Sequence, residues 1–173
     1  ILDLALIESG KLSPSMEPVS LREVANECQT MIEPQAQKRG IKVSFSSFPG
    51  ACYVAADRTR VKQILVNLLS NAIKYNAVGG ATAVECFAPA PQRYRITVRD
   101  SGDGLSPQQI ETLFQPFNRL GRENTAEEGT GIGLVMCKRL VELMGGNMGV
   151  ESTLGKGSVF WFELAQAAEP ALP

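Results

Sequence analysis

Three glycine-rich turns follow one asparagine-bearing helix, and this order constrains the fold of the 173-residue chain more than any other feature. The helix is predicted over Arg58–Tyr75, because Asp57 is a suitable N-cap and apolar residues recur at helical spacing. The turns are Asp100–Gly104, Gly129–Gly133 and Gly155–Ser158. Glycine lets backbone approach a flat ligand closely, so these turns are candidate parts of a binding site.

The composition indicates one soluble globular domain. Hydrophobic residues make up 44% of the chain and charged residues 20%, and the length is sufficient for a real core. The net charge of -1 gives no indication of a nucleic-acid partner. No apolar run approaches the roughly 20 residues that a membrane span needs. The chain opens at Ile1 without a signal-peptide pattern, and we expect it to be part of a longer protein.

The chain contains no histidine, and its four cysteines are widely scattered. Without a Cys-x-x-Cys pair or a histidine, the sequence predicts no zinc site. We expect reduced thiols that fill the interior at Cys28, Cys52, Cys86 and Cys137.

Hydrophobic periodicity predicts further helices and strands around the turns. The strand at Ile41–Phe45 has Ala51–Ala55 as its candidate partner, and the polar segment Asn118–Gly131 is a predicted long loop. The other predicted elements are a helix from Ser20 that Gly40 ends, a hairpin of Thr82–Phe87 with Arg93–Arg99, a short helix after Ser106, a helix at Ile132–Met144 and a hairpin of Asn147–Ser152 with Ser158–Leu164.

Polar residues gather on one side of the predicted Arg58–Tyr75 helix. At about 100° per residue, Asn67, Asn71 and Lys74 share a narrow face. Asparagine is a poor mid-helix residue, and a plain solvated face more often carries Glu, Lys or Gln. Amide oxygens suit a hard cation and an ammonium suits phosphate, although a solvated face stays open as the alternative.

Asp100 ends a predicted strand and enters a Gly-x-Gly turn. Its carboxylate is able to accept a hydrogen bond from an exocyclic amine such as that of adenine, and a plain turn is the alternative. Gly129–Leu134 opens a helix, whose bare N–H groups form a natural phosphate site. This segment follows a long loop, so it does not match the dinucleotide-binding fingerprint. Phe114–Phe117 is either a core anchor or a hinge for the loop that follows.

In this order, the patterns resemble the ATP-binding catalytic domain of sensor histidine kinases, over roughly Pro18 to Leu164. The opening segment Leu2–Leu12 also resembles the end of that family's dimerisation helix and its linker. The matching segments are Asn67–Tyr75 with the asparagine box, Asp100–Gly104 with the first glycine box, Phe114–Phe117 with the phenylalanine box, Gly129–Gly133 with the second glycine box and Gly155–Ser158 with the last glycine turn.

The resemblance implies an α/β two-layer sandwich, in which helices pack on one face of a mixed, mainly antiparallel sheet. It implies three segments: the end of the dimerisation helix and a linker over 1–16, the catalytic domain over 17–165, and a tail or linker over 166–173.

The resemblance also implies a site for ATP and Mg²⁺ between the helices and the long loop. Asn71, assisted by Asn67, would hold the metal, and Lys74 and Arg119 would contact phosphate during transfer. The remaining implied nucleotide contacts are Tyr75, Asp100, Gly102, Gly104, Gly129, Thr130, Gly131, Ile132, Gly133 and Leu134. We expect Arg119–Thr130 to become ordered when nucleotide binds.

The activity implied is transfer of the ATP γ-phosphate to a histidine on an upstream dimerisation domain that this chain lacks. The implied partners are that domain and a response-regulator receiver domain, within a cytoplasmic, homodimeric parent protein whose membrane anchoring stays open. Hydrolytic ATPases of the same fold carry a glutamate one turn before the metal-binding asparagine, and Asn67 there is unable to act as a base. The linker-like start argues against a serine kinase of the anti-sigma type. Asn71, Lys74 and Asp100 argue against a module that only senses ATP.

Overall fold

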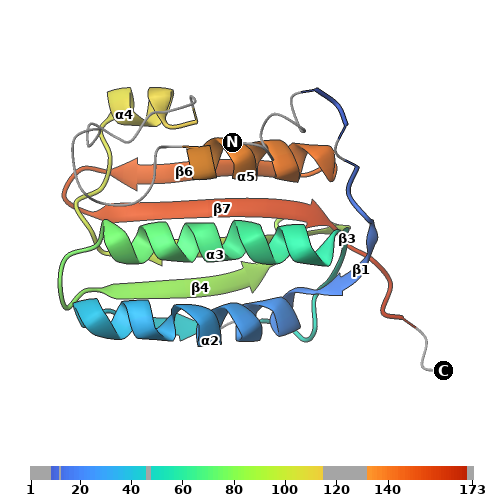
Figure 1. The fold of residues 1–173 in the computed structure, drawn as a ribbon, viewed down its shortest axis with the longest axis horizontal. Helices are drawn as coiled ribbons and strands as arrows, with labels where there is room; N and C mark the ends of the chain where they lie inside the picture. Colours follow the sequence, from blue (N-terminus) through green and yellow to red (C-terminus); the bar gives the residue numbers. More distant parts are fainter. Residues whose placement is uncertain (1–8, 12, 46–47, 115–131, 171–173) are drawn as a thin grey trace.

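The fold consists of one layer of helices on one layer of strands (Figure 1). The computed structural model describes residues 9–11, 13–45, 48–114 and 132–170. In chain order the elements are β1 (Glu17–Ser20), α2 (Leu21–Arg39), β2 (Lys42–Phe45), β3 (Tyr53–Ala56), α3 (Arg58–Lys74), β4 (Ala81–Phe87), β5 (Arg93–Asp100), α4 (Pro107–Thr112), α5 (Ile132–Leu143), β6 (Asn147–Thr153) and β7 (Gly157–Ala165).

The main sheet has five strands in the order β2-β4-β5-β7-β6. Strands β2 and β4 run parallel, and every other neighbouring pair is antiparallel. Helices α2, α3 and α5 lie over the same face of this sheet (Figure 1). The predicted sandwich, with a mixed, mainly antiparallel sheet and helices on one face, is therefore confirmed.

Alternation along the strands explains why only one face is covered. In β5, Ile96 and Val98 are fully buried, whereas Thr97 between them is half-buried. In β7, Phe160 and Phe162 alternate in the same way with Val159 and Trp161, which are half-buried. Since successive side chains point to opposite faces, the buried residues face the helices and form the core with them.

The predicted partner of the Ile41–Phe45 strand is wrong. Strand β3 pairs antiparallel with β1, whereas β2 pairs in parallel with β4. Residues 17–20 carry no strand signal because Pro18 lacks an N–H group, but a strand at the edge of a two-stranded sheet tolerates proline. Pro18 there lies opposite Ala55.

Helix α3 is the central element of the helical layer. The Asp57 carboxylate accepts a hydrogen bond from the Arg60 N–H at 3.2 Å, which confirms the predicted N-cap. The helix ends at Lys74, and Tyr75 is its C-cap. Its buried face, which packs into the core, consists of Val61, Ile64, Leu65, Leu68, Leu69, Ala72 and Ile73.

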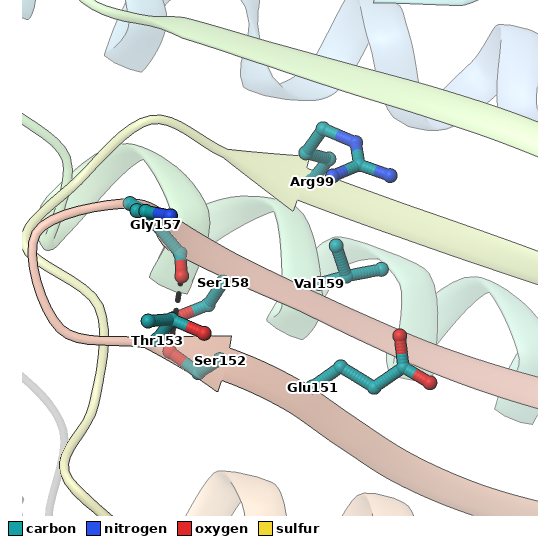
Figure 2. Close-up of a pocket in the computed structure, with 8 residues that line it drawn as sticks. Arg99, Glu151, Ser152, Thr153, Gly157, Ser158 and Val159 are labelled. Carbon is teal, nitrogen blue, oxygen red and sulfur yellow. Dashed lines mark hydrogen bonds between the residues drawn. The ribbon is translucent and has the colours of Figure 1, made fainter.

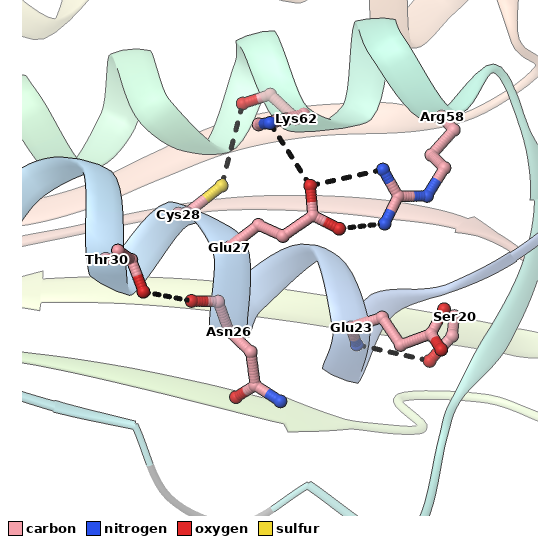
Figure 3. Close-up of polar contacts among 8 residues, drawn as sticks. All are labelled: Ser20, Glu23, Asn26, Glu27, Cys28, Thr30, Arg58 and Lys62. Carbon is pink, nitrogen blue, oxygen red and sulfur yellow. Dashed lines mark hydrogen bonds and ion pairs between the residues drawn. The ribbon is translucent and has the colours of Figure 1, made fainter.

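An ion-pair cluster joins α2 to α3 at the N-terminal end of α3 (Figure 3). The Glu27 carboxylate accepts hydrogen bonds from both terminal nitrogens of Arg58 and from Lys62 Nζ at 3.1 Å. Beside it, the Cys28 thiol donates to the Lys62 carbonyl at 3.8 Å. The cluster fixes the register of the two helices that frame the candidate site.

All four cysteines are buried free thiols, as the sequence predicts. Burial raises the pKa of the Cys28 and Cys137 thiols to about 12, so they stay protonated at neutral pH. In the part of the chain that the structure describes, no helix has the length and apolar character that crossing a membrane requires.

Candidate nucleotide-binding site

Asn67 lies on α3, and its side chain is directed at the start of α5. Its amide oxygen is 3.3 Å from the position that a Cβ on Gly133 would occupy. The Asn67 side chain also acts on the buried Cys137 thiol, whose pKa it lowers against the larger rise that burial causes. The structure therefore brings the predicted asparagine helix and the end of the second glycine segment together, with an amide oxygen directed at the helix start.

The other predicted residues of the α3 face follow toward its C-terminus. Asn71 is half-buried one turn after Asn67, and its carbonyl accepts the Tyr75 N–H at 3.0 Å. Lys74 is half-buried in the last turn, where a cation complements the helix dipole. These residues lie along the same side of α3, so a ligand at Gly133 would extend along the helix toward Tyr75.

Asp100 stands at the end of β5 and is held by its own turn. Its Oδ1 accepts the Gly102 N–H at 2.9 Å. Burial raises the pKa of Asp100, and the backbone N–H groups of Gly102 and Ser158 oppose that rise. A largely buried carboxylate gains from an added donor, which is the role expected of an exocyclic amine.

The first glycine turn packs tightly against neighbouring backbone. A Cβ on Gly102 would lie 2.7 Å from the Tyr75 carbonyl oxygen, and Gly104, at a φ of +75°, would meet the Thr153 carbonyl. No side chain fits at either place. The turn is consequently fixed both to the end of α3 and to the β6–β7 hairpin.

Sequence reasoning missed Asn76, which follows the C-cap of α3. This side chain is 4% exposed and hydrogen-bonds to β4 and to the first glycine turn. An asparagine shortly before Gly79-Gly80 is typical of a turn and by itself indicates no other role. A polar residue directly after an asparagine-bearing helix and ahead of a buried strand was the only available signal.

Several predicted site residues lie outside the described part of the chain. They are Arg119, Gly129, Thr130 and Gly131, together with the side chain of Ile132 and the whole loop expected to order on nucleotide, residues 119–130. Leu134 is described, and its side chain is buried in the core. A role for Leu134 at the nucleotide is therefore limited to its backbone or to shaping the α5 start.

Phe114 packs against the hydrophobic core, which supports the core-anchor interpretation for this residue. Lys138 Nζ lies 4.9 Å from the centre of its ring. Phe117 is outside the described residues.

A cavity of about 200 Å³ lies on the other side of the sheet, at the β6–β7 turn (Figure 2). Arg99 and Val159, which line it, alternate with the buried Val98 and Phe160 and so face away from the helices. Neither Asn67 nor Asp100 borders it. This cavity is separate from the candidate site on the helical side.

Among the described residues, no group of three or more His, Cys, Asp or Glu side chains is placed to hold a metal. The α3 face offers amide oxygens instead. The Asn67 oxygen stands beside a glycine whose missing Cβ leaves space, and Asn71 lies one turn away. Neutral oxygen ligands of this kind fit Mg²⁺ when phosphate oxygens supply the rest of the coordination.

Comparison with known proteins decides the family. Residues 56–168 match the family described as histidine kinase-, DNA gyrase B-, and HSP90-like ATPase, a span that holds α3, Asp100 and Gly133. The chain belongs to this family. The sensor protein GacS of Pseudomonas syringae pv. syringae is 39% identical over 169 residues, which is 95% of this chain and 19% of the relative. The chain thus spans about a fifth of the length of such relatives.

Solved histidine kinases have the same fold. Full-length ShkA in complex with AMPPNP superposes with a TM-score of 0.85 and 30% identity, over 98% of this chain and 35% of ShkA. The catalytic domain of ThkA superposes with a TM-score of 0.76 and 29% identity, over 88% of this chain and 96% of that domain. ThkA has also been solved in complex with the response regulator protein TrrA. The chain is an ATP-binding catalytic domain of the sensor histidine kinase type.

Proposed function

We propose that this chain binds Mg-ATP at the α3 face and donates the γ-phosphate to a histidine on a separate dimerisation domain. The observation that carries this proposal is the convergence of Asn67, Gly133 and the Asp100 turn around one helix. The chain itself contains no histidine, so the acceptor must lie elsewhere. The 1–16 segment is proposed as the end of the dimerisation helix and linker, 17–165 as the catalytic domain and 166–173 as a tail.

Asp100 is proposed to accept a hydrogen bond from the adenine amine, with Gly102 and Gly104 shaping that pocket and Tyr75 lining it. Lys74 and Arg119 are proposed as the phosphate contacts and the catalytic cations. Gly129, Thr130, Gly131, Ile132, Gly133 and Leu134 are proposed to surround the phosphates with backbone N–H groups at the α5 start.

Mg²⁺ would be held by Asn71 and Asn67, and it would neutralise charge on the phosphates when bound. The protein's own contribution is positioning, since phosphoryl transfer requires little covalent chemistry from side chains. The α3 backbone places both amides on one face, with the Asn67 oxygen directed at Gly133.

Transfer is favoured over hydrolysis because of Asn67. Hydrolytic members of this fold use a glutamate at this place to activate water. An amide has no basic lone pair for that purpose, and here its oxygen faces Gly133. Water at this position would therefore be held but not deprotonated.

We further propose that the parent protein is a cytoplasmic homodimer, and that its phosphorylated histidine passes phosphate to a response-regulator receiver domain. The complex of ThkA with a response regulator supports this partner class by analogy. No nucleic-acid partner is proposed, since the net charge is -1.

The test is phosphotransfer from γ-labelled ATP, with the chain mixed with a separately produced, histidine-bearing dimerisation domain. We expect acid-labile label on that domain and none when its histidine is replaced by alanine. Label on neither protein, with rapid release of free phosphate, would instead indicate a hydrolytic ATPase. ATP binding without label or release would indicate a sensing module.

A further inference from the structure

We propose that Asn76 is a positioning residue that sets the place of the adenine-reading turn relative to α3. It does not reach the nucleotide itself. It acts through Ser101 and Gly102 on the carboxylate of Asp100. The inference rests on the proposed nucleotide site and adds to it a residue that determines base specificity at a distance.

The Asn76 amide uses its full hydrogen-bonding capacity. Its oxygen accepts the Ala77 N–H at 2.8 Å and the Ser101 hydroxyl at 3.1 Å. Its nitrogen donates to the Ala81 carbonyl at 2.9 Å and to the Thr82 hydroxyl at 3.4 Å. Two acceptor and two donor interactions are the most that an asparagine side chain normally makes, so its rotamer and its flip state are fixed.

The backbone of Asn76 is anchored from the opposite direction. Arg39, at the end of α2, donates to the Asn76 carbonyl at 2.6 Å. The Arg39 carbonyl in turn accepts the Gly79 N–H at 3.0 Å. The end of α2, the end of α3 and the start of β4 therefore meet at this one residue.

The connection to Asp100 runs through two adjacent residues. The Ser101 hydroxyl donates to Asn76 and accepts the Ala81 N–H at 3.0 Å. A Cβ on Gly102 would come within 3.3 Å of the Asn76 Cα, and the Gly102 N–H binds Asp100 Oδ1. Because these contacts are tight, a shift of Asn76 would also move the Asp100 carboxylate.

The proposed role of Asn76 follows from the need to hold the phosphate-binding residues and the base-binding residue in fixed positions relative to each other. Asn71 and Lys74 are proposed to hold the phosphate end of ATP, and Asp100 is proposed to hold the base. Both ends must bind one nucleotide at the same time, and displacement of a binding group by about 1 Å has a large effect on such binding. Asn76 joins the helix carrying the first set to the turn carrying the second.

The experiment measures the ratio of ATP to GTP affinity by calorimetry in the 173-residue chain and in Asn76→Ala. We expect the preference for ATP over GTP to fall about tenfold in the variant. Its affinity for Mg-tripolyphosphate, which has no base, should be unchanged. In an Asp100→Asn background, Asn76→Ala should change the ratio no further, because the two residues act on one contact. If the two substitutions instead lowered the ATP-to-GTP affinity ratio by independent factors that multiply in the double variant, the proposal would be overturned.

Two further variants keep the test decisive. Ser70→Ala removes a hydrogen bond to Gln35 from the same helix but on the side facing α2, and it should leave the ratio unchanged. Ser101→Ala removes only a hydroxyl from an exposed residue and covers the case in which Asn76→Ala fails to fold. It should lower the ratio by about threefold. An unchanged ratio in Ser101→Ala with normal ATP binding by the unmodified chain would reject the inference alone; no nucleotide binding by the unmodified chain would reject the proposed function.

Discussion

The backbone of Gly102 lies directly against the carbonyl oxygen of Tyr75, so that a Cβ on Gly102 would stand only 2.7 Å from that oxygen. The same Cβ would lie 3.1 Å from Asp100 Oδ1. The end of α3 and the turn after β5 are therefore in contact through backbone, and the contact requires glycine.

Gly102→Ala should accordingly reduce both stability and ATP affinity. Forcing a methyl group into this contact costs about 1–3 kcal/mol in folding free energy and displaces the Asp100 carboxylate. Thermal unfolding and calorimetry would measure the two effects. Asp103→Ala is the matched control, because Asp103 lies in the same turn with an exposed side chain, and it should change neither quantity. Equal behaviour of the two variants would contradict this account of the turn.

Gly133→Ala should separate stability from binding. Alanine in place of glycine inside a helix favours folding by about 1 kcal/mol. The new Cβ, however, would lie 3.3 Å from the Asn67 amide oxygen and displace it. We expect an unchanged or raised melting temperature together with weaker Mg-ATP binding. Unchanged Mg-ATP binding by Gly133→Ala would indicate that Asn67 and the α5 start do not contact the same nucleotide.

The chain should release phosphate from ATP very slowly, since Asn67 occupies the place of the general base in hydrolytic members of the fold. Asn67→Glu supplies a carboxylate there, and a general base contributes about 100-fold or more to such reactions when it is well placed. We expect faster phosphate release from Asn67→Glu than from the unmodified chain. Rapid turnover by the unmodified chain would favour the hydrolytic alternative.

The Glu27 cluster should make the free energy of unfolding depend on pH in the acidic range. Hydrogen bonds from Arg58, and then from Lys62, lower the pKa of Glu27 from 4.5 to about 2. Because the folded-state pKa is depressed, the stabilisation is present above about 4.5 and is lost as the pH falls toward 2. Denaturant unfolding of Glu27→Gln against the unmodified chain should show a difference at pH 7 that is mostly lost at pH 2.

Salt offers an independent check on the same cluster. The side chains of Glu27 and Arg58 are 40% and 38% exposed, so water and ions screen the pair and its contribution is modest. The difference at pH 7 should therefore shrink in 1 M salt. A difference that persists at pH 2, or one that salt leaves unchanged, would assign the effect to helix packing.

The sequence was sufficient for elements whose signals are local. The Asp57 cap and the apolar stripe located α3 to within one residue, and alternation of Ile96 and Val98 identified the covered face of the sheet. Of the two asparagines that helical spacing places on one side of α3, Asn67 lies against Gly133.

The features that depend on partners far along the chain could not be predicted. The choice of β1 as partner of β3 depends on a strand signal that Pro18 obscures, and the parallel pairing of β2 with β4 requires the crossover through α3. The role of Asn76 escaped detection for the same reason, since the contact that gives it meaning is with Ser101, twenty-five residues away.

The most direct test of the account is calorimetric titration of ATP and GTP, with Mg²⁺, into the unmodified chain and Asp100→Asn. The substitution keeps the shape of the side chain but removes the charge that strengthens its hydrogen bond to the adenine amine. Loss of that bond costs about 1.5–3 kcal/mol, so ATP affinity should fall about ten- to a hundredfold while the preference over GTP is lost. Unchanged ATP affinity in Asp100→Asn would contradict the placement of the adenine and with it the proposed site.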